Sequence, residues 1–278
     1  MKIPTYYNGV ITPFDSAVIP LSDRSVFFAD AIYEVMIGRG RKIYQFEDHF
    51  NRLKSNCEAI GLELDITEDK LLEIIDELIC LSLPDEFYAY VQISGNSERR
   101  SHSRSCLKSN LLIYVSEIKI PSVPPEIKAI TYPDLRYGYC NLKTVNLLPA
   151  VLSMREATVK GADIAIFHKN SKITECSHAN IAILKNDTII TPPLSQHILP
   201  GITRRTLIDV CAKNSISCME CAVSLLDLFS SDAVIITSTT KLLQICTQID
   251  GITLPQNGNS LIHLIFSDIY SDFLNKTS

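Results

Sequence analysis

The sequence has no excess of basic residues and no long apolar segment. Its 278 residues include 26 Lys and Arg against 31 Asp and Glu, which gives a net charge of −5 and a pI near 5.7. Binding to nucleic acid or to an anionic membrane requires a positively charged surface, so the sequence disfavours both partners. No apolar run approaches the roughly 20 residues that cross a bilayer, and the N-terminus lacks the apolar core of a signal peptide. We therefore expect a cytoplasmic protein.

The nine cysteines lack the spacing of a disulfide framework. In a cytosolic chain, such an odd and irregular set is best interpreted as reduced thiols, many of them buried as small hydrophobic residues. Cys218 and Cys221 have the spacing of a metal-binding pair, but no second pair accompanies them, so we expect no metal. Internal repeats and low-complexity tracts are also lacking.

The N-terminal half predicts a mixture of strands and helices. Residues 2–12 favour a hairpin with a turn at Asn8-Gly9, and residues 25–37 read as a mostly apolar strand. Asp30 and Glu34 lie within that strand. Because buried acids are costly unless they are partnered, each of them should have a partner.

Two helices follow, at residues 47–61 and 67–83, where apolar residues recur every three or four positions. Thr67 is a plausible N-cap of the second helix. Arg52 lies off the apolar stripe of the first, so we expect it to point away from that helix's core face. The strands 86–95 and 111–115 then flank a charged loop, residues 96–104. This loop is either a solvated hairpin tip or an anion-binding hook.

Prolines mark a linker at residues 119–127, because a proline run is semi-rigid and cannot pair within a central strand. We expect a small N-terminal domain at residues 1–118 and a larger C-terminal domain at residues 128–278. The C-terminal part mixes expected helices, at 148–160, 202–214, 224–229 and 259–274, with short strands. Such a mixture without strict β-α-β alternation predicts two α+β domains.

Lys143 and Glu175 are the candidates for chemistry. Lys143 falls in a polar interval between an extended run, residues 127–132, and a helix that begins near Leu147, so its amine can project from a loop. Glu175 ends a turn just before another strand. A lysine and a carboxylate so placed could hold the two ends of a carbonyl cofactor, or they could be two solvated surface charges. Their pattern alone does not separate these possibilities.

An anion site is also predicted. A helix that opens at Gly201 offers backbone N–H groups and the positive end of its dipole, and the hydroxyls of residues 237–240 follow a buried strand. Each feature by itself is typical of an ordinary helix cap or strand end. Together with the charge of Arg52, they suit a phosphate dianion.

Six segments together resemble the class IV pyridoxal-phosphate transaminases in order and spacing, over nearly the whole chain. They are residues 30–35, 49–53, 141–148, 173–180, 198–204 and 237–240. The resemblance implies the two-domain α+β architecture of fold type IV, pyridoxal 5'-phosphate as the cofactor, and amino acid and 2-oxo acid substrates. It also implies a homodimer with the active site at the interface.

The resemblance assigns roles to individual residues. Lys143 would form the Schiff base with the cofactor and then move a proton at the substrate, and Glu175 would pair with the pyridine nitrogen. Tyr33 would contact the substrate. The residues that would hold the cofactor phosphate are Arg52, Ile202, Thr203, Ser238 and Thr239.

Arg100 and His102 place the chain nearest to the D-amino acid transaminases within this family. Those enzymes carry an Arg-x-His pair at this distance after the glutamine of the preceding strand, here Gln92. The resemblance implies that the pair reaches across the dimer and, with Tyr33, binds the substrate α-carboxylate. The expected reaction converts D-alanine and 2-oxoglutarate to pyruvate and D-glutamate.

Three alternatives stay open. One is a lyase that releases pyruvate from aminodeoxychorismate to make 4-aminobenzoate, and another is a branched-chain L-amino acid transaminase. The third is a binding protein with a degenerate site, which the presence of both Lys143 and Glu175 disfavours. Departures from the family pattern at Asn141 and at residues 176–179 leave the substrate side-chain pocket undefined.

Overall fold

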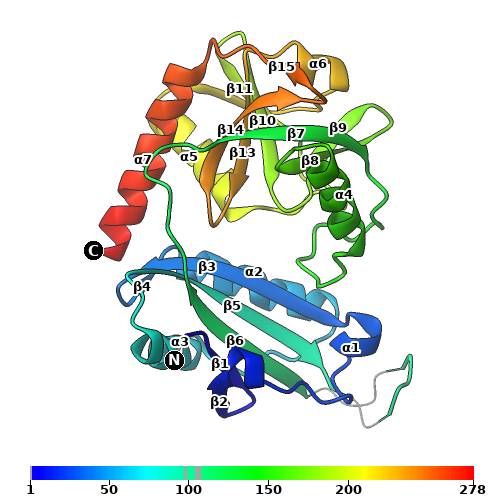
Figure 1. The fold of residues 1–278 in the computed structure, drawn as a ribbon, viewed down its shortest axis with the longest axis vertical. Coiled ribbons are helices and arrows are strands. Elements are labelled where there is room, and N and C mark those ends of the chain that lie inside the picture. Colours follow the sequence, from blue (N-terminus) through cyan, green and yellow to red (C-terminus); the bar gives the residue numbers. More distant parts are fainter. Residues whose placement is uncertain (1, 97–98, 104–107) are drawn as a thin grey trace. The chain divides into compact units, whose positions relative to one another are not determined.

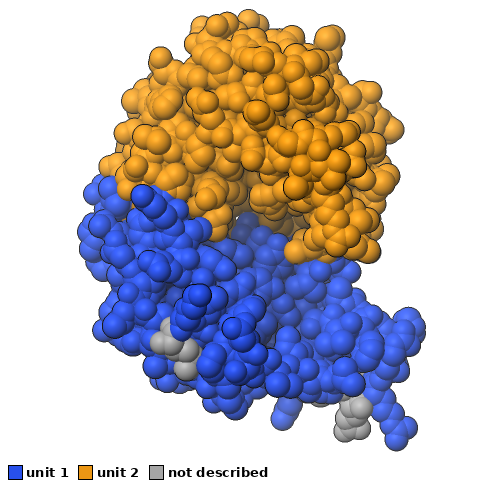
Figure 2. Space-filling model, in the orientation of Figure 1, with its two compact units in different colours: residues 1–120, 142–146, 274–278 blue, residues 121–141, 147–273 orange. Residues whose placement is uncertain are grey.

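The computed structural model describes residues 2–96, 99–103 and 108–278. Its contacts divide the chain into two compact units (Figure 1 and Figure 2). Unit 1 comprises residues 1–120, 142–146 and 274–278, and unit 2 comprises residues 121–141 and 147–273. The segment that carries Lys143 therefore belongs by its contacts to unit 1, although in sequence order it lies within the expected C-terminal domain.

Unit 1 contains an antiparallel sheet of six strands in the order β2-β1-β6-β5-β3-β4. The expected hairpin is confirmed, because Asn8 and Gly9 both adopt positive φ angles between its two strands. The strands are β1 (Pro4–Tyr7), β2 (Val10–Pro13), β3 (Ala31–Arg39), β4 (Lys42–Ile43), β5 (Glu86–Gly95) and β6 (Ser109–Glu117).

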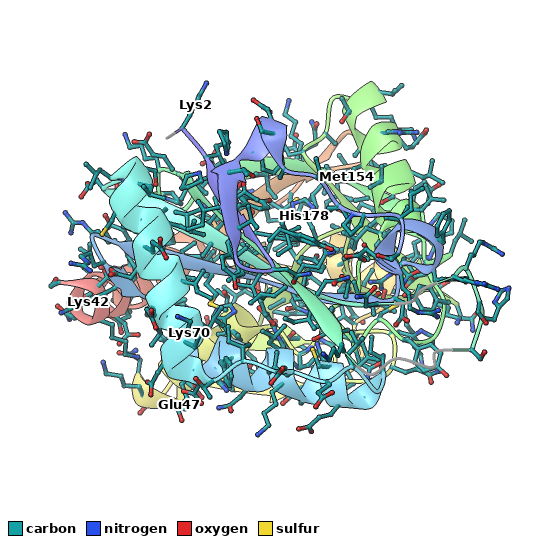
Figure 3. All side chains as sticks on the ribbon, turned by 90° about the horizontal axis from the view of Figure 1, so that it is seen from below. Lys2, Lys42, Glu47, Lys70, Met154 and His178 are labelled. Atoms are coloured by element: carbon teal, nitrogen blue, oxygen red, sulfur yellow. The ribbon has the colours of Figure 1, made fainter. Side chains whose placement is uncertain are left out.

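The helices of unit 1 are η1 (Phe14–Ser16), α1 (Ser25–Phe28), α2 (Phe46–Ala59) and α3 (Glu68–Ser82). The expectation of a single strand over residues 25–37 was wrong. Residues 25–28 form a short helix, and Ala29 ends it in the left-handed conformation (φ 50°) before β3 begins. The N-cap of α3 is confirmed, because the Thr67 hydroxyl accepts a hydrogen bond from the Lys70 N–H at 3.3 Å. Lys70 lies in the first turn of α3 and is labelled in Figure 3.

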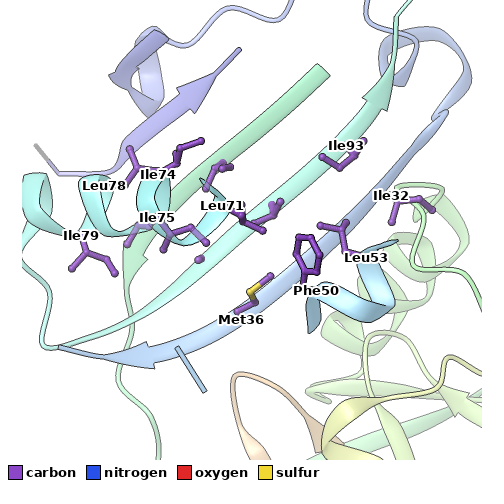
Figure 4. Packing of buried hydrophobic residues seen from close by; sticks show 14 of the residues in the cluster. Ile32, Met36, Phe50, Leu53, Leu71, Ile74, Ile75, Leu78, Ile79 and Ile93 are labelled. Carbon is purple, nitrogen blue, oxygen red and sulfur yellow. The ribbon is translucent and has the colours of Figure 1, made fainter. Parts of the chain in front are cut away.

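Helices α2 and α3 supply the hydrophobic core of unit 1 together with the sheet (Figure 4). Ile32 and Met36 of β3 are completely buried in this core, as is Leu53 of α2. Because side chains alternate along a strand, Glu34 shares the buried face with Ile32 and Met36, while Tyr33 projects from the opposite face. A carboxylate is thus placed within an apolar layer.

Unit 2 contains a mixed sheet of nine strands in the order β12-β11-β10-β13-β14-β7-β8-β9, with β15 paired to β14. The pairs β11/β12, β14/β7 and β7/β8 are parallel, and the others are antiparallel. The strands are β7 (Glu126–Pro133), β8 (Ile164–Lys169), β9 (Lys172–Cys176), β10 (Asn180–Lys185), β11 (Thr188–Thr191), β12 (Ser217–Glu220), β13 (Ala233–Ser238), β14 (Leu242–Ile249) and β15 (Ile252–Thr253).

Four helices complete the chain: α4 (Leu148–Val159), α5 (Ile202–Lys213), α6 (Leu225–Phe229) and α7 (Asn259–Thr277). Glu175 lies inside β9 and not at the end of a turn, because the turn is made earlier by Asn170 and Ser171, whose φ angles are positive. The mixed helices and strands of both units confirm the α+β class. Among the residues that the structure describes, none of the helices is long and apolar enough to cross a membrane.

Candidate active site

Lys143 is held against β3 by main-chain hydrogen bonds. The Tyr33 N–H donates to the Lys143 carbonyl at 2.9 Å, and Thr144 forms an isolated bridge with Ile32. The Lys143 Nζ atom lies 4.3 Å from the centroid of the Tyr33 ring. The structure therefore brings together two of the predicted site residues, with the lysine main chain fixed and its amine over an aromatic face.

Arg52 is bound by the buried carboxylate of Glu34. Arg52 Nε donates to Glu34 Oε1 at 2.7 Å and Nη2 donates to Oε2 at 2.9 Å, while His49 Nδ1 lies 2.8 Å from Oε2. Only 10% of the Arg52 side chain is exposed, and none of Glu34. The expectation that Arg52 points away from the core face was wrong, because a buried carboxylate requires a charged partner.

The electrostatics of this group fix its protonation. Burial by itself raises the pKa of Glu34. The lowering by Arg52 and His49 is larger, so the pKa falls to about 2. Burial also lowers the pKa of His49 and outweighs the opposite effect of Glu34. Since an ionised Glu34 can only accept, a neutral His49 donates to it from Nδ1.

Arg100 and His102 both contact Phe28 of α1. The Arg100 guanidinium carbon lies 5.1 Å from the centroid of the Phe28 ring, and the His102 ring centroid lies 5.3 Å from it in an edge arrangement. Both side chains are exposed. Other residues of the charged loop, Ser97, Glu98 and Arg104, lie outside the described residues.

Glu175 of unit 2 is buried, with 5% of the residue exposed, and it accepts hydrogen bonds from three donors. One oxygen forms an ion pair with Arg136, and the other accepts from the Leu199 N–H at 2.9 Å and from Asn180 Nδ2 at 3.2 Å. Burial raises the pKa of Glu175 to about 7, although Arg136 and the Leu199 N–H both lower it. Arg136 also pairs with Asp134 at 2.8 Å. Glu175 is thus poised between its two protonation states near neutral pH.

Asn180 joins Glu175 to the beginning of α5. Its Nδ2 atom also donates to the Leu199 carbonyl at 2.9 Å. A Cβ atom on Gly201 would lie 1.9 Å from Asn180 Oδ1, so this position accepts no side chain. Gly201 is the N-cap of α5 and provides no side-chain cap, and Ile202 and Thr203 form the buried first turn. The N-cap side chain therefore does not occupy the backbone N–H groups in the first turn of α5.

Hydroxyl groups lie at the end of β13, against which α5 packs. Thr237 is opposite Asn180 in the β10/β13 pairing. Its hydroxyl oxygen is buried without a hydrogen-bond partner among the described residues. Ser238 and Thr239 follow and are half-buried. Unit 2 therefore brings a buried carboxylate, an uncapped helix and a row of hydroxyls to neighbouring elements.

The model of the class IV aminotransferase family matches residues 31–249 of this chain. The chain belongs to the class IV aminotransferase family. It is 30% identical to the D-alanine aminotransferase of Listeria monocytogenes over 251 residues, which cover 88% of this chain and 87% of that protein. The family expectation drawn from the six motifs is confirmed.

Solved structures show the same fold. A branched-chain aminotransferase from Thermoproteus uzoniensis with norvaline superposes with a TM-score of 0.88 at 21% identity, over 98% of this chain and 95% of that one. A Legionella pneumophila protein assigned as a 4-amino-4-deoxychorismate lyase gives a TM-score of 0.85 at 24% identity, over 92% and 96%. At these identities the likeness establishes the fold, which is that of fold type IV.

Class IV aminotransferases depend on pyridoxal 5'-phosphate, which confirms the expected cofactor. The residues present fit this group. The buried Thr237 hydroxyl, which has no partner among the residues that the structure describes, and the first turn of α5 suit a phosphate. A buried carboxylate such as Glu175 suits a protonated ring nitrogen. Lys143 would supply the amine. The roles of the individual residues stay predictions.

The sequence analysis did not identify three residues that bind the carboxylates of the candidate site. They are His49, Arg136 and Asn180. His49 lies within the motif segment 49–53, and Glu34, a carboxylate in an apolar strand, indicated that a partner was needed. No sequence pattern pairs Arg136 with Glu175, which lies 39 residues further along the chain. Asn180 lies within a motif segment, but its contacts with both Glu175 and Leu199 depend on tertiary structure.

We expect the Glu34→Gln variant of the cofactor-free protein to be less stable than wild type at pH 7 by about 3 kcal/mol, because it removes the carboxylate that pairs with Arg52. The pKa of this carboxyl is about 2 when folded against an ordinary 4.5, so its stabilisation is complete above pH 4.5 and is lost as the pH falls towards 2. Urea unfolding at pH 7 and pH 3 measures this. Asp76→Asn, which removes an exposed partner of Arg41, is the control and should change little. Equal losses for Glu34→Gln at both pH values would contradict the assignment.

Glu175→Gln should change the pH dependence of stability in the opposite direction in the cofactor-free protein. The folded pKa of about 7 exceeds the ordinary 4.5, so the folded state holds the extra proton and loses stability as the pH rises from 4.5 to 7. The variant cannot titrate here, so between pH 4.5 and pH 8 its stability should fall by about 3 kcal/mol less than that of wild type. Thermal unfolding at the two pH values tests this, with Glu156→Gln as control. A variant whose stability falls as much as that of wild type over this range would contradict the raised pKa.

Proposed function

We propose that this aminotransferase is specific for D-amino acids and converts D-alanine and 2-oxoglutarate to pyruvate and D-glutamate. The observation that carries the proposal is the 30% identity with a D-alanine aminotransferase over 88% of the chain. The Arg100-x-His102 pair supports it independently. The solved structures named for a branched-chain aminotransferase and a lyase are less similar in sequence, at 21% and 24% identity.

In this proposal Lys143 performs the proton transfer. Its amine would hold the cofactor, and Nζ would take the proton from the substrate α-carbon. When bound, pyridoxal phosphate supplies an electron sink for the electron pair left on that carbon. Tyr33 lies under the amine, and its ring face favours the ammonium form that the lysine adopts on taking up the proton. The main-chain bonds to β3 keep the amine's point of attachment fixed.

Arg52 is proposed to bind the cofactor phosphate, and its guanidinium plane is fixed by its two bonds to Glu34. The same role is proposed for Ile202 and Thr203 in the first turn of α5, and for the hydroxyls of Ser238 and Thr239 at the end of β13. Orienting an arginine before the ligand arrives reduces the entropy that binding would otherwise lose.

Glu175 is proposed to accept a hydrogen bond from the ring nitrogen. Only its ionised form can do so, and a pKa near 7 leaves that form accessible at neutral pH. A positive charge on the ring nitrogen further favours the carboxylate. The bonds that Oε2 accepts from Leu199 and Asn180 hold the carboxylate in one orientation.

The substrate α-carboxylate is proposed to be bound by Arg100 and His102, with Tyr33. A guanidinium matches a carboxylate in shape and charge. Both Arg100 and His102 are exposed in the single chain. Their exposure supports a homodimer in which each chain contributes this pair to a shared site.

The test is a comparison of substrates for the purified protein loaded with pyridoxal phosphate. We expect D-alanine with 2-oxoglutarate to yield pyruvate and D-glutamate, while L-alanine and L-leucine do not react. Arg100→Ala should lower kcat/KM for D-alanine about 100-fold, because the substrate carboxylate loses a charged partner. Arg99→Ala removes the same charge from the neighbouring position and should stay within about twofold.

Two results would overturn the proposal. Pyruvate release from aminodeoxychorismate alone would make the protein the lyase, and turnover of L-leucine in place of D-alanine would make it a branched-chain transaminase. Equal effects of Arg99→Ala and Arg100→Ala would remove the role proposed for Arg100.

A further inference from the structure

Arg24 lies at the base of the loop that carries Arg100 and His102. Its side chain is only 6% exposed, and Nε donates to Asp30 at 2.6 Å. The Nη1 atom donates to the Ser101 carbonyl at 2.6 Å, and Nη2 donates to the His102 carbonyl at 3.4 Å. One guanidinium therefore connects the residue that precedes β3 to two successive carbonyls of the loop.

The main chain around Arg24 is held firmly to the sheet. The neighbouring Asp23 is 1% exposed, and its Oδ2 atom accepts from Ser94 Oγ at 2.7 Å, Asn110 Nδ2 at 3.0 Å and Tyr7 Oη at 3.1 Å. The Arg24 N–H donates to a carbonyl at the end of β5 at 2.9 Å. Arg24 thus extends from a fixed point, while its far end reaches the loop.

Phe28 provides a second contact between α1 and the loop. The Arg24 guanidinium carbon lies 4.6 Å from the centroid of this ring, and Arg100 and His102 contact the same ring. Next to these contacts is a cavity of about 270 Å³, lined in part by Leu21, Phe27 and Arg99. Because Arg99 and Arg100 line an open cavity, the hydrogen bonds from Arg24 add to the contacts with Phe28 in holding this part of the loop.

We propose that Arg24 is a positioning residue for the substrate carboxylate site. By binding the Ser101 and His102 carbonyls it fixes the backbone from which Arg100 and His102 project. Its own charge is balanced by Asp30, so it orients the pair without itself binding the substrate. The inference rests on the proposed function, in which Arg100 and His102 bind the α-carboxylate.

Lysine cannot replace Arg24 in this role. A guanidinium directs donors along several fixed directions in one plane, and here those donors reach Asp30 and two carbonyls. A lysine ammonium is a single point that keeps the charge but cannot span all three acceptors. Arg24→Lys therefore separates the loss of loop geometry from the loss of charge.

The experiment is steady-state kinetics on the holoenzyme with D-alanine, for wild type, Arg24→Lys and Arg100→Ala, and for the double variant. We expect Arg24→Lys to raise KM for D-alanine about 10-fold with kcat within about threefold, and with unchanged absorbance of the bound cofactor. The double variant should lose less than the product of the two single effects, because Arg24 acts in part through Arg100. A purely structural role would instead lower the thermal midpoint and leave KM unchanged.

The second variant, Arg24→Met with Asp30→Asn, removes both charges of the ion pair, and it should raise KM in the same way. If wild type turns over D-alanine but KM is unchanged in both Arg24 variants, or if the effects of Arg24→Lys and Arg100→Ala multiply independently, the inference is overturned. If wild type does not turn over D-alanine, the proposed function has failed, which is a separate result. If the Arg24→Met/Asp30→Asn variant does not fold, the KM of Arg24→Lys alone tests the inference.

Discussion

The ion pair between Glu34 and Arg52 is the constraint on which the proposed site in unit 1 depends. Glu34 lies in the apolar layer between β3 and α2, where a carboxylate persists only with a charged partner. Arg52 and His49 meet that requirement, and both come from α2, so the pair also fixes this helix against β3. The same strand binds the main chain of Lys143. One strand therefore sets the positions of the amine and of the guanidinium that the proposed mechanism needs.

Glu175 shows the contrasting way to bury an acid. Glu34 is compensated so fully that its pKa falls to about 2, and it stays ionised at any physiological pH. Glu175 also contacts an arginine, but Arg136 is shared with Asp134, and burial raises the Glu175 pKa to about 7. Ionised Glu34 stabilises the folded state, whereas ionised Glu175 destabilises it. A destabilising buried acid is typical of a functional site. Asn180 connects this second acid to the helix start that is proposed to bind phosphate.

Much of this arrangement could be predicted from local sequence, and the failures have physical causes. Thr67 caps α3 as expected, because capping depends on residues three positions apart. The left-handed Ala29 that separates α1 from β3 has no glycine to signal it. Arg52 was expected to face away from the core because the apolar stripe of its helix was considered without the carboxylate opposite. The contact of Arg136 with Glu175, and the pairing of the Lys143 segment with β3, depend on tertiary structure, which periodicity does not encode.

The most direct measurement is borohydride reduction of the protein loaded with pyridoxal phosphate, followed by proteolysis and mass spectrometry of the peptides. Reduction fixes the cofactor covalently to the amine that holds it. The structure and the family motifs predict that the modified lysine is Lys143, and that prior incubation with D-alanine prevents the labelling. Labelling of another lysine in place of Lys143 would contradict the site built around β3.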